Sequence, residues 1–366
     1  MRITFLSPRS NLSGGLRVIA IHAQMLQDRG HEVTIVVPAK RQVGAKSQAK
    51  TWTKTWAKSL MRGRLPEREP DEGGHFDQIT VPIVEADRYD FLFTADDIPD
   101  GDALIATWWE TAFSAAAMPP SKGRPCYLIQ HHEVHDFLPW QISRSTYFLP
   151  LKHLVVSNWL GRVMASEYDR NDAVLIPNGV DLAHFTAPPR DKQGQPTIGL
   201  LYSTNAIKGT GTLLQAIERM RATLPNLRVC AFGAEPMSDD LPLPPGSDYL
   251  CRPDQAQIPA LYAGCDLFLC GSTSEGYFLP LLEAMACGCP LVSTDVGAAR
   301  DLIIPGVNGA IVDVGDASAI ADHGLQILKA SNADWQAMSQ ASRDVAAAHT
   351  WAHACDRLEA ALQEAS

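Results

Sequence analysis

The chain has 366 residues, of which 46% are hydrophobic and 20% charged, with 41 acidic residues against 31 basic ones. At roughly 100 to 200 residues per domain, this length predicts two domains, each large enough to close its own core. The ordinary composition excludes a collagen-like, disordered or disulfide-scaffold chain. A net charge of −10 argues against nucleic acid as the main partner, because binding to a phosphate backbone requires a positive surface.

No apolar run reaches the ~18 residues needed to span a bilayer, and the apolar start turns polar from Ser7 onward. We therefore expect neither a transmembrane helix nor a secretory signal. The eight cysteines lie mostly inside apolar runs and form no Cys-x-x-Cys pair. They are interpreted as reduced core residues of a cytoplasmic protein, not as zinc ligands or disulfides.

Short apolar runs alternate with longer amphipathic stretches along the whole chain, a pattern typical of βαβ units and parallel sheets. In the first half, residues 3–7 are predicted as a strand, 15–29 as a helix ended by Gly30, and 32–38 as the next strand. Further strands are expected at residues 103–107, 127–131, 154–157 and 174–176. The polar and proline-rich residues 186–196 then predict a linker.

A second series follows, with a helix over 210–223 and an amphipathic tail over 351–364. Its strands are expected at residues 197–202, 228–232, 249–251, 267–270, 291–294 and 310–312. The pattern predicts an α/β protein with two Rossmann-like, doubly wound domains facing a central cleft. The expected divisions are an N-terminal domain over 1–185 with a basic insertion at about 40–72, a C-terminal domain over 186–345, and a helix over 346–366 that could cross back to the first domain.

Residues 270–290 are the most informative stretch of the chain. An apolar strand ends in a polar loop, and Pro280 falls in the first turn of a predicted helix, where its missing N–H would be unpaired anyway. Gly288 is expected to end that helix. The free amides and the dipole of a helix start attract anions, so this segment predicts a phosphate-binding site.

Two carboxylates accompany this helix start: Glu275 precedes it and Glu283 lies in its first turns. Carboxylates beside an anion site cost free energy unless they bind hydroxyl groups or a cationic centre. A nucleotide sugar supplies such partners, with a diphosphate for the amides and sugar and ribose hydroxyls for the carboxylates. The segment therefore favours a nucleotide-sugar site.

Glu275 and Glu283 are separated by seven residues. This spacing, together with its context, resembles the signature of the family 4 retaining glycosyltransferases, which have the GT-B fold. The context reads Glu-Gly-Tyr-Phe-Leu-Pro-Leu-Leu-Glu-Ala-Met-Ala-Cys-Gly-Cys-Pro. Other segments extend the resemblance over nearly the whole chain. They are residues 13–15, 30–33, 156–160, 176–181 and 208–209.

The resemblance implies a donor site on the second domain. Lys208 and helix amides would hold the diphosphate, Glu283 the ribose, and Glu275 the transferred sugar. The implied donor-binding residues are Gly14, Gly15, Ser203, Lys208, Gly276, Tyr277, Phe278, Leu279 and Glu283. We expect no metal ion and no cofactor, because enzymes of this fold use amides and lysine in place of a divalent ion, and the nucleotide sugar is itself a substrate.

One position departs from the family pattern. The family usually has an arginine five residues before the lysine, and this chain has Ser203 there. The motif therefore lacks one diphosphate cation, for which Arg17, Arg252 and Arg300 are candidate replacements. The variant resembles that of some bacterial polysaccharide and glycolipid transferases.

Three histidines, His131, His132 and His135, follow the apolar residues 127–129 of a predicted strand. A histidine at the carboxyl end of a strand can hydrogen-bond a sugar hydroxyl or share charge at the reacting centre. The family carries an active-site histidine here, so the resemblance adds His131 and His132 to the catalytic candidates Glu275 and Lys208. A structural role stays open for each histidine.

Asp100-Gly101-Asp102 has the form of a metal-binding Asp-x-Asp motif, but it precedes a predicted strand, whereas metal ligands at a cleft would follow one. It is interpreted as a turn.

Residues 40–66 carry eight basic residues and no acidic one. Five of the basic residues recur every four positions and would form one stripe on a helix; they are Lys46, Lys50, Lys54, Lys58 and Arg62. An apolar stripe would lie on roughly the opposite side of that helix, formed by Trp52, Trp56 and Leu60. This pattern is typical of an interfacial helix on anionic lipid. The alternative is a surface insertion whose tryptophans pack on the domain.

These observations predict a retaining, metal-independent glycosyltransferase of the hexosyltransferase type. It would move a sugar from a nucleotide-diphosphate sugar to a glycolipid, lipid or polysaccharide precursor, as a cytoplasmic protein peripheral to the inner face of the cell membrane. Two alternatives remain: a nucleotide-sugar 2-epimerase of the same fold and a non-catalytic nucleotide-sugar-binding protein.

Overall fold

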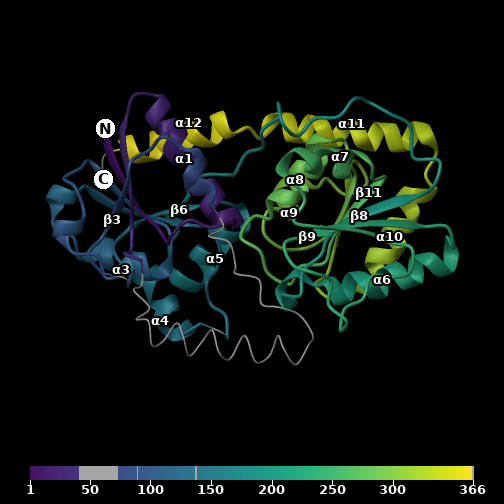
Figure 1. Cartoon of the computed structure of the whole chain (residues 1–366), viewed down its shortest axis with the longest axis horizontal. Helices are drawn as coiled ribbons and strands as arrows, with labels where there is room; N and C mark the ends of the chain where they lie inside the picture. Colours follow the sequence, from purple (N-terminus) through teal and green to yellow (C-terminus); the bar gives the residue numbers. More distant parts are fainter. Residues whose placement is uncertain (41–72, 89, 137, 365–366) are drawn as a thin grey trace, which may run out of the picture. The chain divides into compact units, whose positions relative to one another are not determined.

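The computed structural model describes residues 1–40, 73–88, 90–136 and 138–364 (Figure 1). The basic segment expected to bind a membrane lies outside the described residues, apart from Lys40. The chain divides into two compact units, Met1–Tyr127 with Phe148–Leu151, and Leu128–Tyr147 with Lys152–Ser366. Each unit is described by itself.

The first sheet has seven strands in the order β3-β2-β1-β4-β5-β6-β7, and the described strand registers are parallel. Its strands are β1 (Arg2–Leu6), β2 (Glu32–Val37), β3 (Ile83–Glu85), β4 (Ala103–Ala106), β5 (Arg124–Ile129), β6 (Lys152–Val155) and β7 (Val174–Leu175). The helices of this part are α1 (Gly14–Asp28), α3 (Trp109–Ala117), α4 (Trp140–Ser145) and α5 (Asn158–Tyr168). All four residues of β4 are buried, as in parallel sheets covered on both faces.

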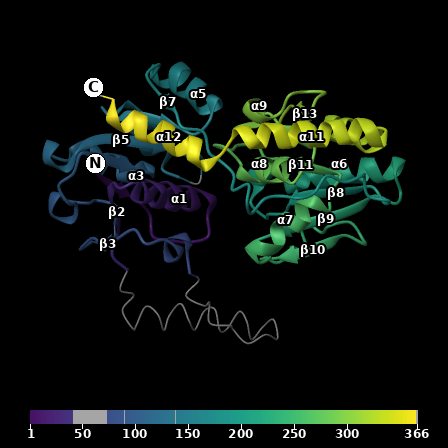
Figure 2. The same ribbon diagram turned by 90° about the horizontal axis from the view of Figure 1, so that it is seen from above.

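The second sheet has six parallel strands in the order β10-β9-β8-β11-β12-β13. They are β8 (Thr197–Leu201), β9 (Arg228–Gly233), β10 (Asp248–Cys251), β11 (Leu267–Cys270), β12 (Leu291–Thr294) and β13 (Gly309–Val312). Seen from above in Figure 2, β11, β8, β9 and β10 follow one another across the sheet. The strands expected from the sequence in both halves are therefore confirmed, and β3 is added.

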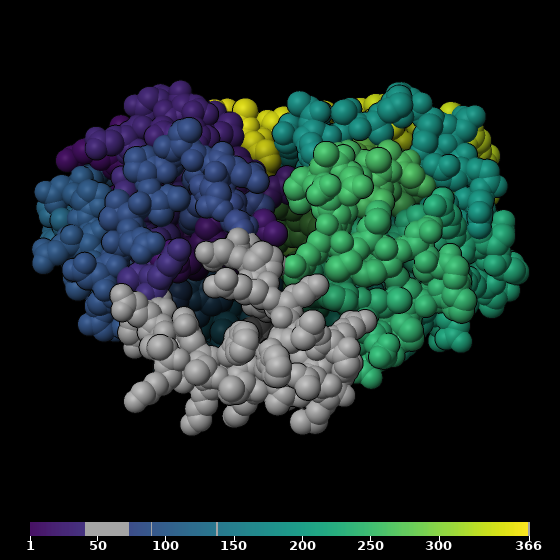
Figure 3. Space-filling view, viewed as in Figure 1, coloured from purple at the N-terminus to yellow at the C-terminus, as the bar shows by residue number. Residues whose placement is uncertain are grey.

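Helices cover both faces of the second sheet. They are α6 (Thr210–Thr223), α7 (Ile258–Ala263), α8 (Leu279–Ala286), α9 (Ala299–Leu302), α10 (Ala317–Lys329) and α11 (Asn332–Ala348). The last helix of the chain is α12 (Trp351–Gln363). In Figure 1, α6 and α10 lie on one side of the sheet, and α7, α8 and α11 on the other. The teal and green residues of these elements form much of the visible face of this unit in Figure 3.

Short 3-10 helices complete the described elements. They are η1 (His75–Gln78), η2 (Ala95–Asp97), η3 (Pro120–Lys122), η4 (Thr146–Phe148), η5 (Ala206–Lys208) and η6 (Gln255–Gln257). No helix in the described part of the chain is both long and apolar enough to cross a bilayer.

The C-terminal helix α12 contacts strands of the first sheet. The ammonium of Lys152, on β6, donates a hydrogen bond to the Ala361 carbonyl at 2.6 Å, and Arg357 Nε donates one to the Leu175 carbonyl, on β7, at 2.8 Å. The inward face of α12 is apolar and buried; its residues are Trp351, Ala354, Cys355, Leu358, Ala361 and Leu362. These apolar residues, which recur at helical spacing in the sequence, therefore form a buried face of α12, as predicted.

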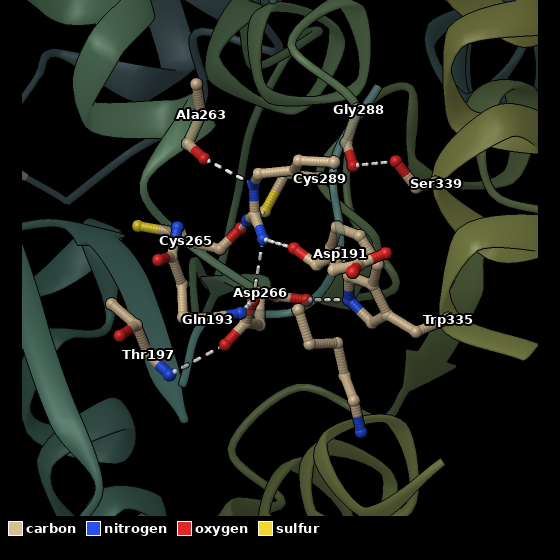
Figure 4. A network of polar contacts seen from close by, with 12 residues as sticks. Asp191, Gln193, Thr197, Ala263, Cys265, Asp266, Gly288, Cys289, Trp335 and Ser339 are labelled. Atoms are coloured by element: carbon tan, nitrogen blue, oxygen red, sulfur yellow. Dashed lines mark hydrogen bonds and ion pairs between the residues drawn. The ribbon is translucent and has the colours of Figure 1, made fainter. Parts of the chain in front are cut away.

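The segment expected as a linker has no regular structure, but it is tied to the second sheet by a polar network (Figure 4). Arg190 forms an ion pair with the buried Asp266 at 3.0 Å, and its guanidinium lies 4.6 Å from the centre of the Trp335 ring. The indole of Trp335 in turn donates to the Asp266 carbonyl at 2.8 Å. This network joins the start of β8 to the strand β11 and the helix α11.

Candidate functional site

The predicted anion-binding segment folds as a strand, a loop and a helix. β11 ends at Cys270, and α8 begins at Leu279 with Pro280 in its first turn. Phe278, at the N-cap, has a φ of 72°, a left-handed conformation that residues with a side chain rarely adopt. Such strain persists only where the surrounding structure holds the backbone in place, and here it falls at the start of α8.

Glu275 lies in this loop with a largely buried side chain, 7% exposed. Its Oε1 accepts hydrogen bonds from the ammonium of Lys208 at 2.7 Å and from the hydroxyl of Ser272 at 2.8 Å. The Lys208 nitrogen also lies 5.2 Å from the centre of the Phe278 ring, within the range of a cation–π contact. The structure therefore brings the two charged catalytic candidates into direct contact.

The local fold of the Lys208 segment explains its position. Lys208 ends η5, in which the amide of Ile207 donates to the side chain of Asn205. Gly209 then turns the chain with a φ of 65°, and a Cβ atom there would lie 1.7 Å from the carbonyl oxygen of Gly271. Only glycine permits this approach, which sets the Lys208 turn against the loop that carries Glu275.

Ser203, at the position of the missing arginine, lies at the start of the same turn. Its backbone exchanges hydrogen bonds with the hydroxyl of Thr210, at 3.2 and 2.7 Å. Of the candidate replacements, Arg300 pairs with Asp295 at 2.5 Å, and Arg252 Nε donates to the carbonyl of Ala234 at 2.8 Å. Arg300 would have to leave its carboxylate before it could serve a diphosphate.

Glu283 is buried on α8, where its Oε2 accepts a hydrogen bond from the hydroxyl of Tyr262 at 3.0 Å. Tyr262 comes from α7 and packs edge to face against Phe232 and Phe268. These aromatic contacts hold the hydroxyl in place, so they orient the carboxylate of Glu283 as well.

The loop after β5 carries His131 and His132, and it touches the anion-binding loop. A Cβ atom on Gly276 would lie 1.7 Å from the carbonyl oxygen of Gln130 and 3.0 Å from the Cα of His131. Glycine is therefore required at position 276 by the close approach of these two backbones. The result is that His131 lies next to the loop of Glu275.

His132 contacts other residues than His131 does. Its Nε2 lies 2.6 Å from the hydroxyl of Tyr168, and its ring contacts those of Tyr147 and Trp159. Burial lowers the pKa of His132, an effect that the negative charge of Glu167 opposes. The ring is thus held within an aromatic group on the side of α5.

The other residues predicted to bind the donor lie at the start of α8 and at the start of α1. Tyr277 is buried and donates a hydrogen bond to the carbonyl of Asn178 at 3.0 Å. Leu279 begins α8. Gly14 and Gly15 begin α1 in the first unit, and a Cβ on Gly14 would meet no atom within 4 Å.

The Asp-x-Asp sequence is engaged in ion pairs. Asp100 pairs with Lys122 at 2.9 Å and Asp102 with Arg2 at 3.0 Å, just before β4. Across the described residues, no group of three or more histidine, cysteine, aspartate or glutamate side chains is arranged to hold a metal ion.

Residues 195–330 match the family model described as glycosyl transferases group 1. The chain is 32% identical over 217 residues to a D-inositol 3-phosphate glycosyltransferase of Mycolicibacterium smegmatis, a match that covers 54% of this chain and 48% of that protein. It is 26% identical to a phosphatidyl-myo-inositol mannosyltransferase of the same organism, over 90% of this chain and 85% of that protein. The chain thus spans about half the length of the first of these relatives.

Solved structures share the fold at low sequence identity. The HepE protein of Anabaena, solved with UDP and glucose, aligns with a TM-score of 0.73 at 17% identity over 100% of both chains. A sucrose-phosphate synthase of Thermosynechococcus elongatus aligns with a TM-score of 0.72 at 16% identity, over 98% of both chains. Together with the two parallel sheets, these matches show the two-domain α/β GT-B fold that the sequence predicted.

The sequence did not identify Ser272 and Tyr262, which orient the two glutamates. Ser272 stands three residues before Glu275, where a loop hydroxyl could have been expected to reach it. Tyr262 is 21 residues from Glu283 and meets it only through the packing of α7 beside α8. No local pattern in the sequence indicates that contact.

Proposed function

We propose that this protein is a retaining glycosyltransferase that takes its sugar from a nucleotide-diphosphate donor. The observation that carries the proposal is the contact of Lys208 with the buried Glu275 beside the start of α8. A cation, a row of helix amides and a hydroxyl-binding carboxylate meet there, which are the groups a sugar diphosphate requires. The group 1 family match over 195–330 covers all of these residues.

In this proposal, the donor diphosphate replaces Glu275 as the partner of Lys208. Among the described residues, none bonds to Glu275 Oε2, so this oxygen is open to a sugar hydroxyl. Glu283, oriented by Tyr262, binds the ribose. The structures of the HepE protein with UDP and UDP-glucose support a nucleotide sugar as the donor class.

The sugar is transferred with retention on one face of the ring. The leaving phosphate oxygen takes the proton of the acceptor hydroxyl while the bond from the anomeric carbon to that phosphate breaks and the new glycosidic bond forms. Lys208 and the amides stabilise the charge that develops on the diphosphate, and Glu275 stabilises the positive character of the sugar. The rate then comes from positioning and electrostatics, with no protein nucleophile and no metal ion.

We propose a membrane lipid or glycolipid precursor as the acceptor, with the protein peripheral to the cytoplasmic membrane face. The names of two relatives, a D-inositol 3-phosphate glycosyltransferase and a phosphatidyl-myo-inositol mannosyltransferase, support a polar hydroxylated acceptor that carries phosphate. Exposed apolar side chains on α4, Trp140 at 36% and Ile142 at 52%, offer a surface for a lipid.

A donor panel tests the proposal. The protein is incubated with UDP-, GDP- and ADP-sugars, with and without a membrane lipid extract, and the products are separated by liquid chromatography and identified by NMR. Donor turnover that requires the extract supports transfer. Release of an epimerised sugar without acceptor would instead identify the 2-epimerase, and tight binding without turnover the non-catalytic protein.

A further inference from the structure

The ring of His131 has two neighbours at a single nitrogen. Its Nδ1 lies 3.2 Å from the carbonyl oxygen of His132 and 3.2 Å from Nε2 of His135. The rings of His131 and His135 are in contact, with their centres 4.9 Å apart and their planes at 57°. Both histidines belong to the loop that touches Gly276 through the backbone of Gln130.

These contacts favour a proton on Nδ1 of His131. A carbonyl oxygen only accepts hydrogen bonds, so a neutral His131 satisfies this contact with its proton on Nδ1. The nitrogen of His135 that faces the same N–H must then act as an acceptor, which requires His135 to be neutral with its proton on its own Nδ1. In this arrangement the Nε2 of His131 keeps its lone pair.

The surroundings favour a neutral His135. Burial lowers its pKa, the charge of His131 lowers it further, and the adjacent Asp136 opposes the effect. At the neighbouring His132, the charge of Glu167 raises the pKa, and the charges of His131, His135 and Arg144 lower it. The lowered pKa favours the neutral form of His135.

The rest of the loop fixes the carbonyl that receives the His131 proton. That carbonyl also accepts the amide of Val134 at 2.8 Å. The amide of Glu133 donates to the hydroxyl of Tyr147 at 2.8 Å, and the hydroxyl of Ser143 donates to the Glu133 carbonyl. These bonds come from α4 and η4, so the loop geometry does not depend on His135 alone.

We propose that His135 is a positioning residue: it holds His131 as the Nδ1–H tautomer, so that Nε2 of His131 accepts a hydrogen bond from a hydroxyl of the sugar or the acceptor. This inference rests on the proposed function for the identity of the hydroxyl. It assigns different tasks to the three histidines, because His132 is engaged with Tyr168.

A spectroscopic test addresses the tautomer without any activity. The full chain is labelled with ¹⁵N-histidine, the His131 signals are assigned with His131→Phe, and long-range ¹⁵N–¹H correlations are recorded at pH 8. We expect His131 as the Nδ1–H tautomer in the parent protein, a mixture of tautomers in His135→Phe, and recovery in His135→Gln, whose amide oxygen can accept. An Nε2–H tautomer in the parent protein, or an unchanged one in His135→Phe, would overturn the inference.

Kinetics give the second readout, with the donor and acceptor found in the panel. We expect His135→Phe to lower kcat roughly 3- to 10-fold, the effect of one neutral hydrogen bond, with the donor KM unchanged within about two-fold. His135→Gln should recover at least half of the loss, and His353→Phe, a matched change on the exposed side of α12, should have no effect. Equal kcat in His135→Phe and the parent protein would contradict the positioning role. A tautomer that responds to His135→Phe in a protein that transfers no sugar would refute the proposed function and leave the positioning role standing.

Discussion

The ammonium of Lys208 lies 2.7 Å from Oε1 of Glu275, although the two residues are 67 positions apart in the sequence. Glu275 is 7% exposed and Lys208 29% exposed, so the carboxylate has been taken out of water and depends on this cation and on Ser272. In the proposed function, a bound diphosphate competes for Lys208. Lys208 is therefore expected both to stabilise the free protein, through Glu275, and to bind the donor.

Replacing Lys208 with methionine tests this link. We expect kcat/KM to fall at least about 100-fold, because the charge that stabilises the leaving diphosphate is lost. We also expect the free energy of unfolding to fall by about 1–3 kcal/mol, less than for a fully buried pair because the lysine is partly exposed. Both are measured on the purified protein, by initial rates and by urea unfolding.

The double variant Lys208→Met/Glu275→Gln separates the two effects. Removing both charges should restore most of the stability, because no buried carboxylate is left unpaired, while activity stays low. Lys208→Arg, which keeps the charge, serves as the control. Near-normal rates in Lys208→Met would show that the donor site is misassigned.

Gly276→Ala tests the contact between the two loops. A Cβ at this position would lie 1.7 Å from the carbonyl oxygen of Gln130, so one of the backbones must move. Because Gln130 precedes His131 and Gly276 follows Glu275, we expect activity to fall by more than about ten-fold, as misplaced catalytic groups lose their alignment. Gly194→Ala is the matched control, since a Cβ there meets no atom within 4 Å. Full activity in Gly276→Ala would contradict the close approach.

The strands and the anion-binding helix could be predicted from the sequence because their signals are local. The apolar residues 267–270 and the Pro280 and Gly288 that bound α8 lie within 22 residues of one another, and the structure places β11 and α8 there. The short strand β3 was missed because all three of its residues are exposed and its apolar pattern is weak.

Contacts between distant residues could not be predicted in the same way. The sequence indicated Lys208 and Glu275 as separate ligands, through the resemblance to a family, and gave no sign that they pair in the free protein. The left-handed backbone of Phe278 was likewise unexpected, because an aromatic residue carries no local preference for it. Both features arise from packing across the second sheet.

Glu283→Gln tests the ribose contact. A glutamine keeps the size of the side chain but loses the charge that strengthens hydrogen bonds to hydroxyls, so we expect the donor KM to rise roughly ten-fold with a smaller change in kcat. Tyr262→Phe, which removes only the hydroxyl 3.0 Å from Glu283, should give a weaker effect of the same kind. Steady-state rates measured over a range of donor concentrations give KM and kcat for each variant. A fall in kcat at constant KM would place Glu283 at the reacting centre instead.

Two buried histidines predict a loss of stability in acid. Burial lowers the pKa of both His22 and His153 from 6.5 to about 4. Between those values the unfolded chain binds protons that the folded chain does not, so the stabilising contribution is complete above pH 6.5 and is lost as the pH falls toward 4. Each histidine accounts for at most about 3 kcal/mol. Urea unfolding at several pH values should show that stability depends less steeply on pH in His22→Leu than in the parent protein.

The ion pair of Arg190 with Asp266 predicts that a residue outside the donor site controls the stability of the second sheet. Asp266 is 1% exposed, and besides the guanidinium it accepts the backbone amides of Gln193 and Thr197 at 2.8 and 3.0 Å (Figure 4). Arg190 also donates to the carbonyls of Ala263 and Cys265.

Arg190→Met removes the charge and most of these bonds while keeping the side-chain length. The carboxylate of Asp266 would stay buried with amide partners alone, so we expect the free energy of unfolding of the second unit to fall by about 2–4 kcal/mol. Arg219→Met, on the exposed side of α6, should change it by less than about 0.5 kcal/mol. Because Arg190 touches neither Lys208 nor Glu275, activity below the unfolding transition should remain normal in both variants. A loss of rate without a loss of stability would mean that the segment acts on the donor site directly.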